Sequence, residues 1–198
     1  TIEKKASLQT EYEMKLQHLK RKAAKEKGMA RVESYKQLFR AYAHYQSDSA
    51  LTYLERIEDL AKELPQQPQI QTWVSIGRAE VFGIMGLYKS AATLLEKISL
   101  KGESDAMRLY YYQVSRSVYG WMADYGEIGE SSKKLQQLTA NYRDSILLVE
   151  TNPTNRAIVL ADKLINDGHL QEGRVLCLRT LSHADSLQHA YLYTLLLI

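Results

Sequence analysis

The sequence predicts an all-α superhelix, or solenoid, of about four helix pairs behind a leading amphipathic helix. Three observations support this fold class. Apolar residues recur at steps of three and four, and no stretch shows the sustained period-two alternation of a half-buried strand. Only three Pro and ten Gly occur in 198 residues, whereas all-β architectures need many turn residues. The predicted helices also form pairs that repeat about every 40 residues, as solenoids do.

The first element, residues 1–27, is expected to be a basic amphipathic helix. Its apolar residues recur at helical steps from Leu8 to Leu19, and no Pro or Gly interrupts it before Gly28. The remaining residues, 28–198, are expected to form the repeat array. Its pairs lie near 30–64, 69–99, 105–150 and 155–182, with a truncated fifth pair from 186.

The limits of these helices follow from helix-breaking and capping residues. Pro65 and Pro68 end the first pair, because proline cannot continue a helix. The run Ser47-Asp48-Ser49 offers capping side chains for a helix that starts near Ala50. Similar breaks at the Gly-containing and Asn-containing loops separate the later helices.

A small residue near the start of each second helix carries the repeat. These residues are Ala50, Ala91, Ser131 and Gly173, spaced by 41, 40 and 42 positions. Gly86, Gly126 and Gly168 precede the last three of them by five positions. A small residue lets two antiparallel helices approach, and a glycine can adopt positive φ to end the first helix. Each pair alone leaves an apolar face uncovered, so the pairs are expected to stack into a superhelix with a concave surface.

Composition excludes several classes of protein. A chain that is 45% hydrophobic and 25% charged is too apolar for a disordered protein, and it contains no run of 18 apolar residues that could span a bilayer. The single cysteine, Cys177, cannot form an internal disulfide, and no Cys/His cluster indicates zinc. Since Cys177 occupies an apolar position of the repeat, we interpret it as a buried small hydrophobic residue.

No arrangement of residues indicates catalysis. The GxSxG, HExxH, P-loop and GxGxxG motifs are missing, and the five His are scattered. We therefore expect no catalytic residue, no metal and no cofactor, and we expect the protein not to be an enzyme.

The net charge of +3 is uneven along the chain. Residues 1–36 carry ten Lys/Arg against five Glu (+5), which leaves 16 against 18 (−2) for the rest. The basic segment could meet phosphate or an acidic membrane surface, but a solvated helix face is the commoner use of such charge.

Tyrosine is the second compositional oddity. Fourteen of the 18 aromatic residues are Tyr, including the run Tyr110-Tyr111-Tyr112. Three consecutive residues point in three directions on a helix, so they cannot all be core. Packing between helices and contact with a ligand both remain open for them.

Small and bulky positions in this order resemble the tetratricopeptide repeat (TPR). The stretch AEVFGIMGLYKSAATLLEKI (79–98) is the best match, and VLADKLINDGHLQEGRVLCLRTL (159–181) is second. The resemblance implies that the first helix of each pair lines a partner-binding groove. The residues at the implied groove positions are Trp73, Ile76, Glu80, Gln113, Arg116, Asn155 and Asp162. They lack the repeated Lys/Asn pattern with which TPR domains clamp a C-terminal carboxylate.

A narrower resemblance covers residues 1–64 most clearly. This region is similar to the N-terminal region of an uncharacterised family of bacterial membrane-anchored regulators. In that family a secretion signal precedes TPR-like repeats, and a transmembrane helix and a cytoplasmic regulatory region follow. The resemblance implies that the chain, which starts at Thr1 and ends in the apolar run 191–198, is a fragment from the periplasmic or extracytoplasmic side. A cytoplasmic location is the alternative.

These observations lead to one function and one alternative. The leading hypothesis is a non-enzymatic scaffold that binds a protein or peptide, as the sensory or interaction region of a larger bacterial signalling or transcription-regulating protein. The alternative is a nucleic-acid-binding helical repeat that uses the basic N-terminal helix. The sequence disfavours nucleic acid because the basic residues are confined to one end and the aromatic residues are not interleaved with them. Membrane contact is expected only through segments absent from this fragment.

Overall fold

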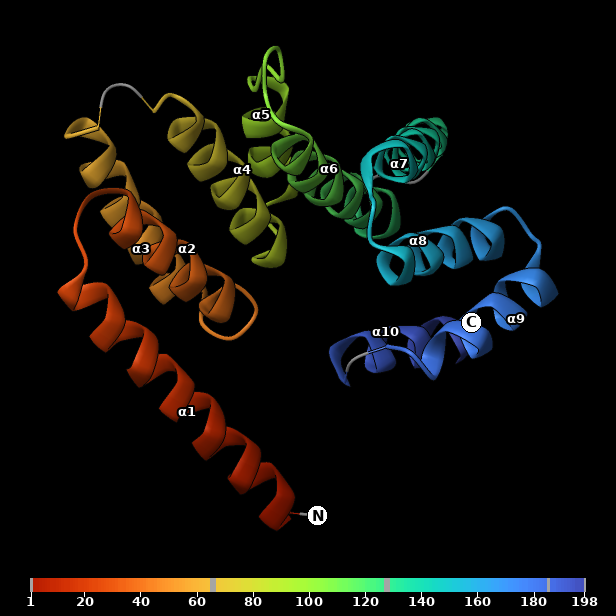
Figure 1. Ribbon diagram of the computed structural model, residues 1–198. Helices are drawn as coiled ribbons and strands as arrows, with labels where there is room; N and C mark the ends of the chain where they lie inside the picture. The colour runs from red at the N-terminus through yellow and green to blue at the C-terminus, as the bar shows by residue number, and fades with distance from the viewer. Residues whose placement is uncertain (1, 65–66, 127–128, 185, 198) are drawn as a thin grey trace. The chain divides into compact units, whose positions relative to one another are not determined.

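The computed structural model describes residues 2–64, 67–126, 129–184 and 186–197. Within these ranges ten α-helices follow one another and no strand occurs. The helices pack pairwise in sequence order inside each of two compact units (Figure 1). The prediction of an all-α helical repeat is confirmed.

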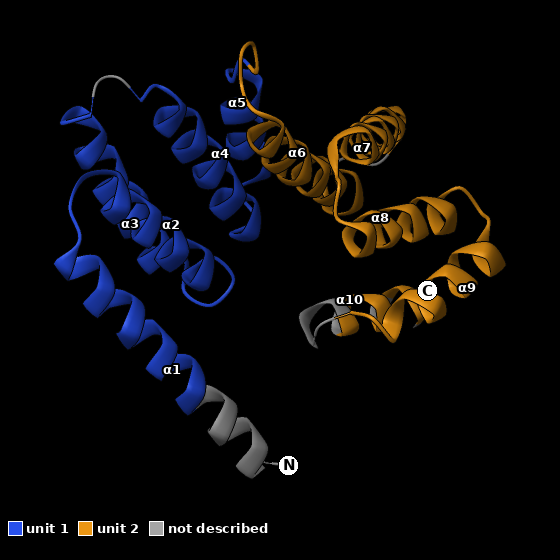
Figure 2. Ribbon diagram, in the orientation of Figure 1, with its two compact units in different colours: residues 1–99 blue, residues 100–198 orange. Residues whose placement is uncertain are grey.

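The two units comprise residues 1–99 and residues 100–198, drawn in blue and orange in Figure 2. Unit 1 contains α1 (Ile2–Lys25), α2 (Gly28–Tyr42), α3 (Ser47–Lys62), α4 (Gln69–Ile84) and α5 (Tyr88–Glu96). Unit 2 contains α6 (Asp105–Tyr125), α7 (Glu130–Val149), α8 (Pro153–Asn166), α9 (Leu170–Leu181) and α10 (Ser186–Leu197).

Unit 1 is held together by apolar side chains between consecutive helices. Phe39 of α2, Leu54 of α3 and Leu95 of α5 are fully buried, and each contributes about 1.5–3 kcal/mol relative to an exposed position. The small residues Ala50 and Ala91 are also fully buried, where α3 packs on α2 and α5 packs on α4. This burial agrees with the role that the repeat predicts for a small residue in these two pairs.

In unit 2 a small residue also lies at a helix crossing, where α9 packs closely on α8. A Cβ added to Gly173 would lie 2.7 Å from Cγ1 of Ile165 and 3.2 Å from the carbonyl oxygen of Ala161. Glycine therefore permits an approach that any larger residue would obstruct. Cys177, one turn further along α9, is fully buried in an apolar cluster that includes Leu192 of α10.

The repeat register fails in the pair α6–α7. Ala50, Ala91 and Gly173 are each the fourth residue of their helix, whereas Ser131 is the second residue of α7 and is exposed. The glycine that faces the partner helix in this pair is Gly120 of α6, where an added Cβ would lie at an ordinary contact distance of 3.6 Å from Thr139 Cγ2 of α7. Equal spacing along the sequence thus did not place Ser131 at the helix crossing, because α7 begins two residues later than the repeat requires.

Two of the three predicted turn glycines have positive φ, and the exception again lies between α6 and α7. Gly86 and Gly168 have φ of 79° and 88°, as expected for residues that end a helix in the left-handed region. Gly126 has φ of −94°, so the prediction of positive φ is wrong there. Gly129, with φ of 108°, directly precedes α7 instead.

Capping side chains begin α6 and α8, whereas the predicted Ser47-Asp48-Ser49 cap is wrong. α3 starts at Ser47 behind Gln46, and no side chain caps it. The side chain of Ser104 accepts a hydrogen bond from the Met107 amide at 3.3 Å at the start of α6. Asn152 performs the same role for α8.

The tyrosines of α6 pack α6 against α7. The ring centroid of Tyr142 on α7 lies 6.1 Å from that of Tyr111, 6.1 Å from that of Tyr112 and 5.7 Å from that of Tyr119. The Tyr119 and Tyr142 rings are parallel within 3°. Helix packing therefore accounts for these four rings, whereas Tyr125 is 74% exposed.

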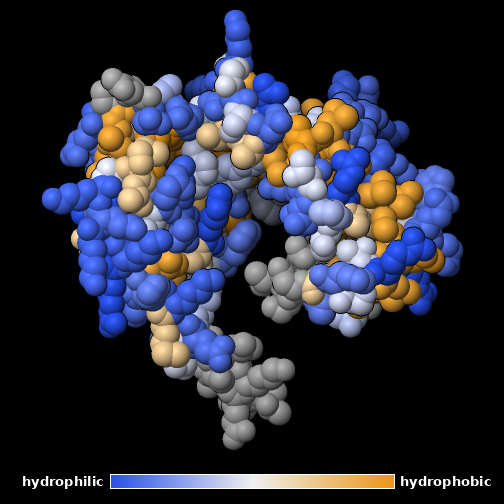
Figure 3. Space-filling model, viewed as in Figure 1, coloured by the Kyte–Doolittle hydropathy of each residue, from blue (hydrophilic) through white to orange (hydrophobic). Residues whose placement is uncertain are grey.

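Hydrophilic residues make up most of one face of the chain. Blue side chains predominate on the face shown in Figure 3, in keeping with a mean hydropathy of −0.37. None of the described helices combines the length and the hydropathy that crossing a bilayer requires.

Candidate functional site

The predicted groove residues of unit 1 lie on α4 and contribute largely to packing. Trp73 is 5% exposed, its ring meets Phe39 edge-on at a centroid distance of 5.2 Å, and the Lys36 ammonium lies 5.2 Å from the ring centre. Ile76 is fully buried. Glu80 is partly buried, with Oε1 3.9 Å from Nε2 of His44. Partner contact by these residues stays a prediction, and packing on α2 accounts for the position of Trp73.

In unit 2 the fold brings two predicted groove residues together across 46 positions of sequence. Arg116 of α6 donates a hydrogen bond from Nη1 to Oδ2 of Asp162 on α8 at 2.9 Å. Gln113 lies exposed one turn before Arg116, and Asn155 lies partly buried near the start of α8. These two positions also stay predictions.

Asp162 is the centre of a polar cluster that joins four helices. Arg143 of α7 donates from Nε to the same Oδ2 at 2.7 Å, and Asn166 donates from Nδ2 to Oδ1 at 3.1 Å. Nη1 of Arg116 also donates to the Tyr191 hydroxyl of α10 at 3.4 Å. We call these five residues the Asp162 cluster.

The Asp162 cluster places two guanidinium groups against one nearly buried carboxylate. Only 9% of the Asp162 side chain is exposed, against 24% for Arg116 and 14% for Arg143. Burial acts to lower the pKa of Arg116, but the Tyr191 hydroxyl and the Asp162 carboxylate outweigh it, and the pKa is raised. Two guanidinium groups facing one carboxylate leave a net positive charge. The cluster can therefore both connect the helices and attract an acceptor group.

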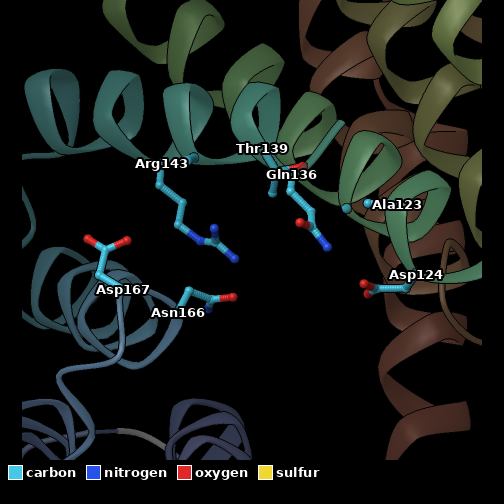
Figure 4. A pocket seen from close by; sticks show the side chains of 9 residues that line it. Ala123, Asp124, Gln136, Thr139, Arg143, Asn166 and Asp167 are labelled. Carbon is cyan, nitrogen blue, oxygen red and sulfur yellow. The ribbon is translucent and has the colours of Figure 1, made fainter. Parts of the chain in front are cut away.

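A polar cleft of about 320 Å³ lies beside this cluster, formed by α6, α7 and the C-terminal end of α8. Its lining residues are Gly120, Ala123, Asp124, Gln136, Thr139, Ala140, Arg143, Asn166 and Asp167. Figure 4 shows Arg143 and Gln136 pointing from α7 into this polar cleft. Asn166 lies opposite them, and Asp124 of α6 lies at another side.

The polar cleft carries groups suited to binding. The guanidinium of Arg143 and the amides of Gln136 and Asn166 offer hydrogen-bond donors, and Asp124 and Asp167 offer acceptors. Among the described residues, no group of three or more His, Cys, Asp or Glu is placed to hold a metal ion. Burial raises the pKa of the Cys177 thiol, which lowers the population of the nucleophilic thiolate. Chemically, the arrangement can recognise a small polar segment.

Sequence reasoning missed Arg143 because the groove assignment considered only the first helix of each pair. A signal was nevertheless present in the spacing. Gln136 and Arg143 are seven positions apart, and Asp162 and Asn166 are four apart, so each pair shares one helix face. Whether these two faces meet depends on how α7 crosses α8. Because the sequence repeat placed Ser131 wrongly on α7, it could not predict that crossing.

Comparison with known families identifies a relationship over nearly the whole chain. The family described as the SusR N-terminal TPR domain matches the chain over residues 2–197, which is nearly its whole length. No curated protein and no solved structure shows a significant match.

Proposed function

Because the chain belongs to the SusR N-terminal TPR domain family, we propose that it is a non-enzymatic scaffold that binds a protein or peptide partner through the polar cleft of unit 2. We propose further that it is the sensory or interaction region of a larger bacterial signalling or transcription-regulating protein. TPR domains stack helix pairs to present extended binding surfaces, which supports the first part of the proposal.

The observation that carries the proposal is the convergence of side chains from three helices on one cleft. A cleft of about 320 Å³ is at the lower end of ligand-site volumes and suits one or two side chains of a peptide. The Arg143 guanidinium is pre-oriented by its 2.7 Å hydrogen bond to Asp162. A donor that is already fixed loses less conformational entropy when it binds an acceptor on a partner.

Photo-crosslinking tests this assignment. A photoreactive residue replaces Gln136, which lines the polar cleft, or Lys134, which is exposed on the same helix two positions away and does not line it. In cells that produce the full-length gene product, we expect a discrete polypeptide adduct at position 136 and none at position 134. Equal adducts at both positions, or no adduct at position 136, would contradict the proposal.

We also propose that the chain faces the periplasm or another extracytoplasmic space. The support is the similarity of residues 1–64 to the N-terminal region of membrane-anchored regulators. Protease added to cells with a permeabilised outer membrane is expected to digest this region of the full-length product while a cytoplasmic marker survives. Protection of both would instead favour a cytoplasmic location.

A further inference from the structure

Basic and aromatic side chains are interleaved in unit 1, although they are not interleaved along the sequence. The Lys20 ammonium of α1 lies 5.5 Å from the ring centre of Tyr42 on α2. The Arg56 guanidinium of α3 lies 5.2 Å from the ring centre of Tyr53 and 6.0 Å from that of Tyr35. The sequence argument that aromatic residues stand apart from basic ones is therefore wrong for the folded chain.

These side chains surround a pocket of about 290 Å³ between α1, α2 and α3. We call it the basic–aromatic pocket, and its lining residues are Lys20, Ala23, Ala24, Tyr35, Leu38, Tyr53 and Arg56. Ala23 and Leu38 are buried and form an apolar floor, whereas Lys20 and Arg56 are exposed. The pocket thus presents two cations at the rim of an apolar depression.

Neither cation has a carboxylate partner among the described residues. Three acidic side chains on α3 and just after α1 are engaged elsewhere: Glu26 accepts a hydrogen bond from Ser34, Glu58 pairs with Arg78 at 2.7 Å, and Asp59 pairs with Lys62 at 2.7 Å. A hydrogen bond to Tyr42 raises the pKa of Lys20 above its usual range, so the ammonium is charged at neutral pH. Two positive charges without a carboxylate partner among the described residues favour an anionic ligand at this pocket.

The rings themselves disfavour a nucleic acid. Single-stranded nucleic acids bind by stacking bases on open aromatic faces. Here Tyr42 and Tyr53 are 5% and 6% exposed and stack on each other with centroids 5.7 Å apart. Arg56 covers the Tyr53 ring. Little ring face is therefore left for a base, whereas the planar fork of Arg56 matches a carboxylate.

We propose that the basic–aromatic pocket is a second binding site, which takes a Glu or Asp side chain of an acidic polypeptide segment between Lys20 and Arg56. The choice of a polypeptide over other carboxylates rests on the proposed function. The site itself is independent of the polar cleft, since it lies in unit 1 and shares no residue with it.

Fluorescence anisotropy with a labelled peptide of alternating Glu and Gly tests the site. The double variant Lys20→Gln/Arg56→Gln removes both rim charges. The matched control Lys22→Gln/Lys62→Gln removes two charges from the same two helices, but each of these lysines has an acidic partner and lies outside the pocket. We expect the first variant to weaken binding about tenfold or more and the control to change it by less than about twofold.

The remaining arms separate the possible causes. The same peptide with Gln in place of Glu should not bind, and Lys20→Arg/Arg56→Lys should retain most of the affinity because it keeps both charges. Equal losses in the two double variants would overturn the proposal, as would absence of binding by the unsubstituted chain or tighter binding of an oligothymidylate of equal charge. Circular dichroism confirms that the variants are folded. Crosslinking at position 136 reports on the polar cleft separately, so failure of one site is distinguishable from failure of the other.

Discussion

The carboxylate of Asp162 accepts a 2.7 Å hydrogen bond from Nε of Arg143, which joins α8 to α7. The same Oδ2 atom accepts from Arg116 of α6 at 2.9 Å. Three helices that belong to two successive pairs thus share one nearly buried charge. Removal of that charge would leave two guanidinium groups facing each other.

Asp162→Asn is therefore expected to destabilise the chain by about 3–5 kcal/mol, the range measured when one partner of a buried ion pair is removed. Urea unfolding followed by circular dichroism measures the change. Asp144→Asn serves as the control, because it also removes one carboxylate from an ion pair, but at an exposed position. Asp144 pairs with Lys163 at 2.8 Å, and 56% of the Asp144 side chain is exposed. The control should cost about 0–1 kcal/mol. Similar losses in the two variants would show that the Asp162 cluster does not hold the helices together.

Two glycines should respond in opposite ways to alanine. Gly173→Ala places a Cβ 2.7 Å from Cγ1 of Ile165, so α9 must move or Ile165 must change rotamer, at a cost of about 1–3 kcal/mol. Gly120→Ala meets Thr139 at an ordinary contact distance of 3.6 Å and gains up to about 1 kcal/mol of helix propensity. Thermal unfolding should show a lower midpoint for Gly173→Ala and an equal or higher midpoint for Gly120→Ala. The reverse order would place the close helix crossing elsewhere.

The thiol of Cys177 should make stability depend on pH in the alkaline range. Burial raises its pKa in the folded chain above the ordinary value of 9.0. Above about pH 9 the unfolded chain then binds fewer protons than the folded chain, so the free energy of unfolding falls as the pH rises. Since tyrosines also titrate there, the measurement is the difference between the unsubstituted chain and Cys177→Ala. The slope of unfolding free energy against pH should be less steep in Cys177→Ala, and identical slopes would mean that the thiol does not titrate differently in the two states.

The fold class was predictable from sequence because helical periodicity and repeat spacing are local properties. The equal spacing correctly predicted the packing positions of Ala50, Ala91 and Gly173, because their helices start in the same register and each is the fourth residue of its helix. The spacing failed at Ser131, because α7 begins at Glu130 and Ser131 is only its second residue. The candidate site was predictable only in part for a related reason. Asp162 could be placed on its helix face, but its partner Arg143 depends on the crossing of α7.

Helix capping gives a last test of where local sequence signals hold. Asn152 accepts hydrogen bonds at Oδ1 from the amides of Thr154 and Asn155, both at 3.0 Å, and Pro153 occupies the first position of α8. Asn152→Ala removes an acceptor from two otherwise unsatisfied amides and should lower the free energy of unfolding by about 1 kcal/mol.

Ser47 carries an equally good capping side chain by type, but it is already the first residue of α3 and caps nothing. Ser47→Ala should therefore change the free energy of unfolding by less than about 0.5 kcal/mol. Chemical denaturation of both variants measures the difference, and a cost for Ser47→Ala as large as that for Asn152→Ala would restore the cap that the sequence predicted at Ser47-Asp48-Ser49.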